Sequence, residues 1–334
     1  MIDYVSGFFP CFHDPDKLFA GGVVSFDAFY NKEWNVVKKL SVEGSYSSKI
    51  QLLSTGNNEI YFTGNPVKFL QGHNLFGTND LKELLNKFFK KLMTYPELGL
   101  NPTDHQLDMI EAGIYKLTRV DVNETWHLKD GKDVLAWIRA IGETAYMKHR
   151  GRGMFDKDTL YFGKNSRRWA LKCYFKGLEI LKKGHQLPAE LQCPEMMEYA
   201  NKALRIEGVI RQLELKRRDL EMPFFWRENT ATMLLYEFIN TLELSDKFML
   251  EDAVLNTLPI RLRLVYQAWL NHDDLKHIMS SSAFYRWRKQ LLAYGIDIAT
   301  ASPKEKNNVI PLMRVLEAEP VGIPSWAYER NLVA

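Results

Sequence analysis

Most of the first 220 residues alternate between short apolar runs and turn residues, a pattern that predicts β-strands. The turns are supplied by Asn57-Asn58 and by Gly64-Asn65-Pro66. Helices are predicted near 80–93 and 134–145, where apolar residues recur every three or four positions. The expected strands cover 22–26, 34–37, 49–53, 59–62, 116–125 and 204–210, with a hairpin over 159–176. Together these elements predict an α+β sheet domain over residues 1–222.

Beyond Pro223 the apolar spacing becomes helical. Three helices are indicated, the last opened by Ser282 as an N-cap. Their apolar positions are Leu262, Val265, Ala268 and Trp269 in the first, Leu275 and Ile278 in the second, and Phe284, Trp287, Leu291 and Leu292 in the third. Three helices at this spacing suit a helix-turn-helix. Residues 223–334 are therefore expected to form a helical DNA-binding or capping domain.

Three of the expected strands alternate apolar with polar or charged residues. In a strand, alternate side chains point to opposite faces, so each of these strands has one apolar and one charged face. The charged faces carry Arg119, Asp121 and Asn123 in the first strand, Lys172, Tyr174 and Lys176 in the second, and Arg205 and Glu207 in the third. If the three strands share a sheet, one of its faces gathers two carboxylates, several cations and a tyrosine.

The residues alone leave two interpretations of this charged face open. In the first, the face lies open to water and its charges pair across strands. In the second, Asp121 and Glu207 hold a divalent cation beside Tyr174, and the surrounding cations bind a DNA phosphate. Hard carboxylate oxygens suit Mg²⁺ or Mn²⁺.

Composition narrows the setting more than the function. The chain has 334 residues and is 46% hydrophobic, ample for a folded core. No apolar run is long enough to cross a bilayer, and the first residues lack the basic stretch of a signal peptide. Its three cysteines indicate neither a disulfide framework nor a cysteine zinc site. We therefore expect a cytoplasmic protein with no membrane partner, while the net charge of +3 decides little about DNA.

Several segments, in order along nearly the whole chain, resemble the gene II/X family of filamentous-phage replication initiators. The most specific is Gln71-Gly-His-Asn-Leu-Phe-Gly77, within the similar stretch 68–81. Further matches are Thr118-Arg-Val-Asp121, Leu171-Lys-Cys-Tyr174-Phe-Lys176-Gly-Leu-Glu179, Leu204-Arg-Ile-Glu207, Phe284-Tyr-Arg-Trp287, Tyr294-Gly-Ile296, Asn307–Arg314 and Pro324–Tyr328.

The resemblance implies a rolling-circle initiator that nicks one strand of double-stranded origin DNA and later rejoins the displaced single strand. It also implies an antiparallel-sheet fold like that of HUH endonucleases, the cytoplasm of a bacterial host, and a host helicase and polymerase as partners. The family's Tyr-x-Lys-x-x-Glu element maps onto Tyr174, Lys176 and Glu179, with Tyr174 as the nucleophile that forms a 5′-phosphotyrosine and leaves a 3′-OH. One departure is that none of the eight histidines forms a His-hydrophobic-His pair. The metal site must then be rich in carboxylates or use His73 alone.

Such chemistry gives each candidate residue a role. A tyrosine with a pKa near 10 needs a nearby cation or base before it attacks phosphorus, and Lys176 is expected to stabilise the phenolate or the leaving oxygen. Arg119 and Arg205 are expected to clamp phosphates or orient the carboxylates. His73 is either a third metal ligand, besides Asp121 and Glu207, or a residue that stabilises a turn.

Two further residues keep open interpretations. Glu179 binds metal, acts on the tyrosine proton or pairs with Lys176. Tyr161 is expected to be a packing aromatic, and it is the first alternative nucleophile. No phosphate-binding loop of the Gly-x-x-x-x-Gly-Lys-[Ser/Thr] type occurs, in keeping with rejoining that draws on the phosphotyrosine bond.

The C-terminal helices carry cations that would contact origin DNA if the helix-turn-helix interpretation holds. They are Arg261, Arg263, Lys276, Arg286, Arg288 and Lys289. The alternative for these residues is a solvated face over an aromatic core. The rival functions are a non-catalytic DNA-binding replication regulator and a metal nuclease that uses water in place of tyrosine.

Overall fold

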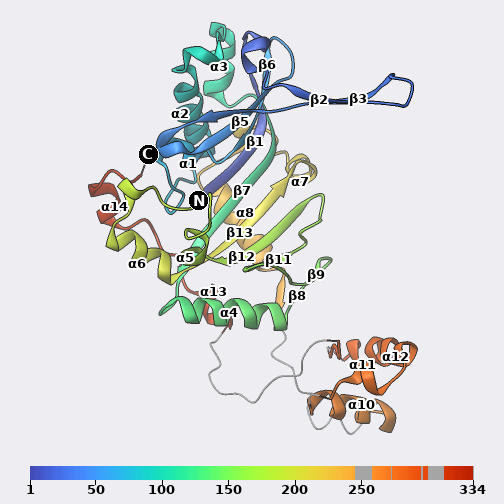
Figure 1. Cartoon of the computed structure of the whole chain (residues 1–334). Coiled ribbons are helices and arrows are strands. Elements are labelled where there is room, and N and C mark those ends of the chain that lie inside the picture. Colours follow the sequence, from blue (N-terminus) through green and yellow to red (C-terminus); the bar gives the residue numbers. More distant parts are fainter. Residues whose placement is uncertain (245–257, 272, 295, 300–311, 334) are drawn as a thin grey trace.

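The computed structural model describes residues 1–244, 258–271, 273–294, 296–299 and 312–333 (Figure 1). Its centre is a nine-stranded antiparallel sheet. In spatial order the strands are β10 (Met154–Asp156), β11 (Thr159–Phe162), β12 (Trp169–Phe175), β13 (Ala203–Arg211), β7 (Lys116–His127), β1 (Ile2–Pro10), β6 (Glu59–Gly64), β5 (Lys49–Ser54) and β4 (Leu40–Glu43). The α+β class with a large antiparallel sheet is thereby confirmed.

The three strands with charged faces, β12, β13 and β7, are direct neighbours in this sheet. Lys172 lies opposite Glu207, and Tyr174 lies opposite Arg205, so these residues project from the same face. The alternate residues Leu171, Cys173 and Ile206 are buried in the hydrophobic core on the other face. The expectation that the three strands share one sheet is confirmed.

The central strand β1 was not predicted from the sequence. Its register shifts twice against β7, between Ile2 and Val5 and between Ser6 and Gly7, which interrupts the two-residue alternation by which strands are recognised. Even so, Ile2 and Val5 are completely buried in the main core. The missed strand is important because it brings Asp3 and Tyr4 to the charged face of the sheet.

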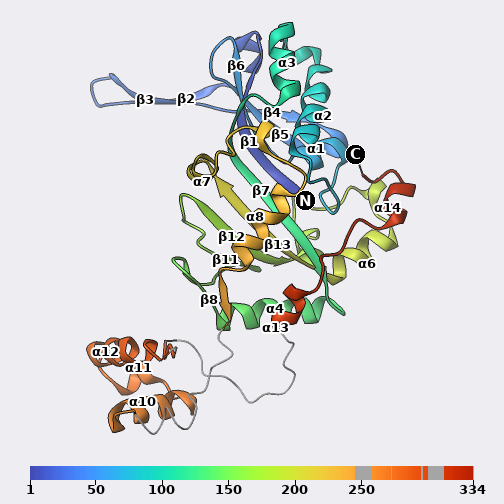
Figure 2. The same cartoon turned by 180° about the vertical axis from the view of Figure 1, so that it is seen from behind.

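Helices cover the apolar face of the sheet (Figures 1 and 2). Phe89 of α2 (Leu81–Met93) packs against Phe9 and Phe62 from the sheet. At the other end of the sheet, α4 (Gly131–Thr144) contributes Trp137 to the same core. Four shorter helices lie near the rims of the sheet: α1 (Pro66–Gln71), α5 (Lys176–Glu179), α6 (Pro194–Lys202) and α7 (Gln212–Arg217). The remaining elements of this part are α3 (Asp104–Ala112) and the small strands β8 (Ala145–Met147), β9 (Gly151–Arg152) and β14 (Leu242–Leu244). The hairpin β2 (Gly22–Phe26) and β3 (Lys32–Val37) projects away from the body of the molecule.

Residues on both sides of the expected division at Met222 contribute to the sheet domain's core. Helix α8 (Thr230–Ile239) stacks Phe238 on Trp169 of β12, with ring centroids 4.1 Å apart. Near the end of the chain, α13 (Leu312–Glu317) places Leu316 in the main core, and α14 (Ser325–Glu329) packs Trp326 against Phe76. The sheet domain is therefore completed by segments from beyond Met222.

Between these segments, three helices form a separate small core. They are α10 (Ile260–Leu270), α11 (Leu275–Ile278) and α12 (Ser281–Leu292), and their buried residues include Leu262, Trp269, Phe284 and Leu291. The N-cap of α12 is Ser280 rather than the expected Ser282, since the Ser280 side chain accepts a hydrogen bond from the Ala283 N–H. Within the ranges that the structure describes, no helix is both long and apolar enough to span a membrane.

Candidate active site

The charged face of the sheet contains a cavity of about 600 Å³. Its walls come from β1, β5, β6, β7, β11, β12 and β13, and from the segments that follow β6 and β12. The lining includes the carboxylates Asp3, Asp121, Glu179 and Glu207, the phenols Tyr4, Tyr161 and Tyr174, and the cations Lys49, Lys68, Arg119 and Lys172. Residues from opposite ends of the first 210 positions thus meet at one place.

Tyr174 projects into this cavity from β12 and is only 8% exposed. Its hydroxyl donates a hydrogen bond to Oε2 of Glu207, 3.2 Å away. Burial, reinforced by the negative charge of Glu207, raises the pKa of the Tyr174 hydroxyl well above its ordinary value of 10. Without further positive charge Tyr174 is therefore a neutral phenol, with a carboxylate already placed to accept its proton.

Asp121 and Glu207 share one cation, Lys172. The Lys172 ammonium is hydrogen-bonded to Oε1 of Glu207 and lies 3.6 Å from Oδ2 of Asp121. Arg119 adds a bidentate contact to Asp121, with distances of 2.7 and 2.5 Å. Burial, against the attraction of Lys172, raises the pKa of Asp121 to about 7, and the charge of Glu207 contributes. Burial acts on Glu207 in the same direction, but Lys172 and a hydrogen bond from Asp121 outweigh it and lower the pKa of Glu207.

Lys176 begins α5 and is completely buried, so it does not continue the exposed face of β12. Its ammonium lies 2.6 Å from Oε2 of Glu179 and donates to Oδ1 of Asn74 at 2.9 Å. Nδ1 of His185 lies 2.7 Å from the other carboxylate oxygen of Glu179. Of the three interpretations of Glu179, the contacts observed are those of the ion pair with Lys176.

Arg205 is also completely buried, although it shares the charged face with Tyr174. Its guanidinium donates to the backbone carbonyls of Asn74, at 2.6 Å, and Leu75, at 2.8 Å. A third bond, of 3.1 Å, reaches Oγ1 of Thr125. The expected phosphate clamp thus differs from what is observed, because the loop at 74–75 covers Arg205 and uses its donors.

His73 lies in the same loop but not on the wall of the cavity, which is lined by its neighbour Asn74. It is 1% exposed, and its Nδ1 accepts a hydrogen bond from the Leu75 N–H at 3.3 Å. Burial lowers the pKa of His73 to about 4. These contacts are those of a neutral histidine that stabilises a turn. Across the described part of the chain, no group of three or more His, Cys, Asp or Glu side chains is placed to hold a metal ion.

Two cavity residues had no assigned role in the sequence-based interpretation. Asp3 accepts hydrogen bonds from the amide of Asn74, 3.1 Å from each carboxylate oxygen, and from the amide of Asn65. Lys172 was visible on the charged face, but only the register of β12 against β13 shows that it bridges two carboxylates. The available signal for Asp3 was its position between the apolar residues Ile2 and Tyr4. Tyr161 lines the same cavity, so it remains the alternative nucleophile.

The C-terminal cations lie on the three-helix core formed by α10, α11 and α12. Arg261, Lys276, Arg286 and Lys289 are exposed, and Arg263 is half-buried. Arg288 donates from its Nε to Asp297 at 2.7 Å, which differs from an open DNA-contacting side chain. The Arg286 guanidinium lies over the ring of Trp287, 4.7 Å from its centroid.

Comparison with known proteins places the whole chain. Residues 1–229 match the model of the N-terminal part of the phage gene II replication-associated protein, and residues 255–333 match the model of its C-terminal part. The chain is 37% identical over 337 aligned residues to the replication-associated protein of the same kind from Enterobacteria phage I2-2, covering 97% of this chain and 96% of that protein.

A solved structure of a rolling circle replication initiator protein from Geobacillus stearothermophilus is a distant match. It shares 12% sequence identity and a TM-score of 0.34, over 74% of this chain and 88% of that one. The two family models and the relative at 37% identity confirm the resemblance noted in the sequence. The chain belongs to the family of phage replication-associated proteins, the gene II/X replication initiators.

Proposed function

We propose that this protein is the nicking and rejoining enzyme of rolling-circle replication, with Tyr174 as its nucleophile. The observation that carries the proposal is the hydrogen bond from the Tyr174 hydroxyl to Glu207 inside a cavity of carboxylates and cations. Membership of the replication-associated family supports DNA as the substrate. A buried tyrosine beside a proton acceptor is the arrangement that nucleophilic attack requires.

The reaction exchanges one phosphodiester for another. The Tyr174 oxygen forms a bond to phosphorus while the bond from phosphorus to the 3′ oxygen breaks, and the tyrosine proton passes to Glu207. Lys172 lines the cavity and is placed to give the leaving 3′ oxygen its proton, whereas Lys176 is buried against Glu179 and Asn74. Attack by a 3′-OH on the phosphotyrosine reverses these steps and closes the strand. The bond energy is conserved, so rejoining needs no nucleotide cofactor.

The carboxylates fit a hard divalent cation, Mg²⁺ or Mn²⁺, held by Asp121 and Glu207 with Asp3 beside them. Magnesium is often bound by one or two carboxylates together with substrate phosphates, so a closed cage of protein ligands is not required. The raised pKa of Asp121 supports this assignment, since it indicates that Lys172 and Arg119 neutralise the carboxylate pair incompletely. When bound, the cation supplies positive charge to the phosphate oxygens. Arg119 then orients Asp121.

We further propose that the three helices α10 to α12 form a helix-turn-helix-like unit that binds origin DNA. Its support is the third helix, α12, which has a Ser280 N-cap and the exposed cations Arg286 and Lys289. The sheet domain, largely within residues 1–222, would carry the chemistry on single-stranded DNA, and the helical unit would recognise the duplex. A host helicase and polymerase remain partners that the family resemblance implies.

One experiment separates this proposal from its rivals. Protein, supercoiled origin plasmid and Mg²⁺ are incubated, denatured and resolved, with the DNA labelled. The proposal requires nicked DNA that stays attached to the protein through its 5′ end. Nicking without attachment would identify a nuclease that uses water, and binding without nicking would identify a non-catalytic regulator.

A further inference from the structure

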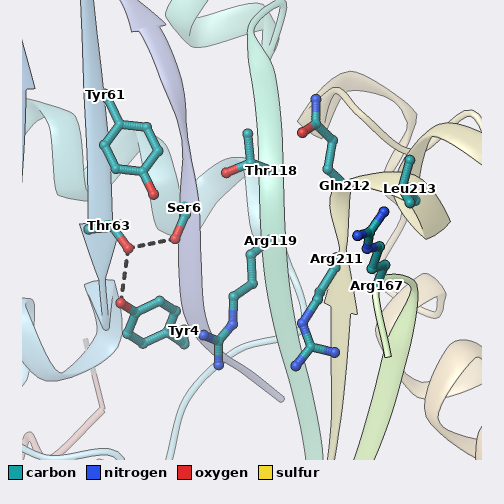
Figure 3. Close-up of a pocket in the computed structure, with 10 residues that line it drawn as sticks. All are labelled: Tyr4, Ser6, Tyr61, Thr63, Thr118, Arg119, Arg167, Arg211, Gln212 and Leu213. Atoms are coloured by element: carbon teal, nitrogen blue, oxygen red, sulfur yellow. Dashed lines mark hydrogen bonds between the residues drawn. The ribbon is translucent and has the colours of Figure 1, made fainter. Parts of the chain in front are cut away.

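A second pocket of about 470 Å³ adjoins the active-site cavity on the same face of the sheet (Figure 3). We call it the arginine groove; its lining is Tyr4, Ser6, Tyr61, Thr63, Thr118, Arg119, Arg167, Arg211, Gln212 and Leu213. Tyr4, Thr63 and Arg119 line both hollows, so the groove continues directly from the cavity. Among the described residues that line it, three are arginines and none is acidic.

Two of these arginines face each other across the sheet. Arg119 of β7 lies directly opposite Arg211 of β13, and Figure 3 shows their side chains extending next to each other. Like charges in directly opposed positions destabilise a sheet. Burial, and then the charge of Arg119, lower the pKa of Arg211. Asp121 compensates Arg119, but none of the described residues lining the groove offers a carboxylate to Arg211 or Arg167, so a bound anion would relieve the repulsion.

The positive wall is fixed by the fold. The Arg211 guanidinium donates to the carbonyl of Ser166 at 2.6 Å and to that of Lys164 at 3.0 Å. The Arg211 backbone N–H donates to the carbonyl of Arg168 at 2.7 Å. These bonds attach the loop between β11 and β12 to the end of β13. The exposed Arg167 of this loop is thereby held at the groove.

The opposite wall and the floor carry hydroxyls and aromatic rings. Oγ1 of Thr63 is 2.6 Å from the Ser6 hydroxyl and 2.9 Å from the Tyr4 hydroxyl. The Tyr61 ring packs against Phe8, with centroids 5.1 Å apart. A small inorganic anion needs no aromatic wall, whereas a nucleic acid strand offers both phosphates and planar bases that stack on tyrosine.

We propose that the arginine groove binds the single-stranded DNA that flanks the scissile phosphate on one side. Arg167 and Arg211 contact its phosphates, and Tyr61 stacks on a base. Arg119, on the border of both hollows, lies between this strand and the reacting phosphate. The inference rests on the proposed function, because it takes the cavity around Tyr174 as the position of the nick.

The test uses the full chain and a labelled single-stranded oligonucleotide that spans the plus-strand nick site. Arg167→Ala removes an exposed guanidinium, and Tyr61→Leu removes an aromatic face. Arg139→Ala, exposed on α4, is the matched control for loss of a positive charge. Affinity is measured at several salt concentrations, with oligonucleotides of full length and with the flank removed on the 5′ side or on the 3′ side.

We expect Arg167→Ala to weaken binding of the full-length strand severalfold and to reduce the salt slope by about 0.7, the value for one phosphate contact on a single strand. Tyr61→Leu should weaken binding with an unchanged salt slope. Removing one particular flank should abolish both differences, while Arg139→Ala should match the wild type. The groove assignment is overturned if Arg167→Ala binds like the wild type, or if its deficit persists with either flank removed. Failure of the wild type to form any covalent adduct would instead overturn the proposed function, whatever the groove variants do.

Discussion

Tyr174 and Glu207 lie on the neighbouring strands β12 and β13, and the tyrosine hydroxyl donates to Oε2 of the glutamate at 3.2 Å. The other oxygen of Glu207 is held by Lys172, which also lies 3.6 Å from Asp121. The proton acceptor of the tyrosine is therefore one member of a buried group whose charges depend on each other. Changes at this group should separate chemistry from folding.

Tyr174→Phe should abolish the covalent protein–DNA adduct and lower the nicking rate by roughly a thousandfold or more, because the nucleophile is lost. The ring that packs in the sheet is retained, so unfolding should change by only about 1 kcal/mol, the size of one hydrogen bond. Adduct formation on labelled origin DNA measures the effect. Tyr161→Phe is the matched control, since Tyr161 lines the same cavity. Loss of the adduct in Tyr161→Phe, with Tyr174→Phe still active, would exchange their roles.

Asp121→Asn and Glu207→Gln should each lose nicking activity and bind Mg²⁺ or Mn²⁺ roughly tenfold more weakly or worse, because each removes a charged oxygen ligand. Titration calorimetry of the full chain with Mn²⁺ gives a measure that does not depend on activity. Asp158→Asn, on the exposed turn before β11, is a suitable control. Nicking by the wild type that continues in excess chelator would contradict the metal assignment.

Arg205→Met should destabilise the fold by on the order of 3 kcal/mol, because it leaves the buried carbonyls of Asn74 and Leu75 without their donors. Urea unfolding followed by circular dichroism measures this. Arg167→Met, at an exposed position, should be close to neutral in the same assay. Equal stability of Arg205→Met and the wild type would restore Arg205 as a candidate phosphate ligand.

His73 should make the fold sensitive to acid. Burial lowers the pKa of His73 from 6.5 to about 4 in the folded state, so the unfolded chain binds the proton first. Its contribution is fully present above about pH 6.5 and is lost as the pH falls toward 4, by on the order of 3 kcal/mol in total. The free energy of unfolding of His73→Gln should depend less steeply on pH in this window than that of the wild type. Parallel curves would show that His73 does not titrate in this way.

In the helical unit, the double variant Arg286→Gln and Lys289→Gln should weaken binding of duplex origin DNA and reduce the salt slope by about 0.9 for each lost phosphate contact. Arg288→Gln should instead lower the stability of the unit, since Arg288 is paired with Asp297. Binding at two salt concentrations and thermal unfolding distinguish the two effects. Unchanged affinity and slope in the double variant would leave α10 to α12 as a structural cap.

The sequence by itself determined the features that depend on local periodicity. A strand with one buried face must alternate, so the patterns around Asp121, Tyr174 and Glu207 were sufficient to predict three strands and the side chains that share a face. The helix over 80–93 followed in the same way from its apolar spacing. The motifs around Gln71–Gly77 and Tyr174 were sufficient to indicate the family, which the comparisons confirmed.

Only the tertiary structure decided which members of the charged face are accessible. Arg205 and Tyr174 occupy opposed positions in the sheet, yet a loop from 130 residues earlier in the chain covers Arg205 and takes its hydrogen bonds. Asp3 joins the cavity because β1 lies beside β7, and its register shifts conceal the alternation on which sequence patterns depend. Burial and charge pairing arise from contacts between distant segments, and a local repeat carries no information about them.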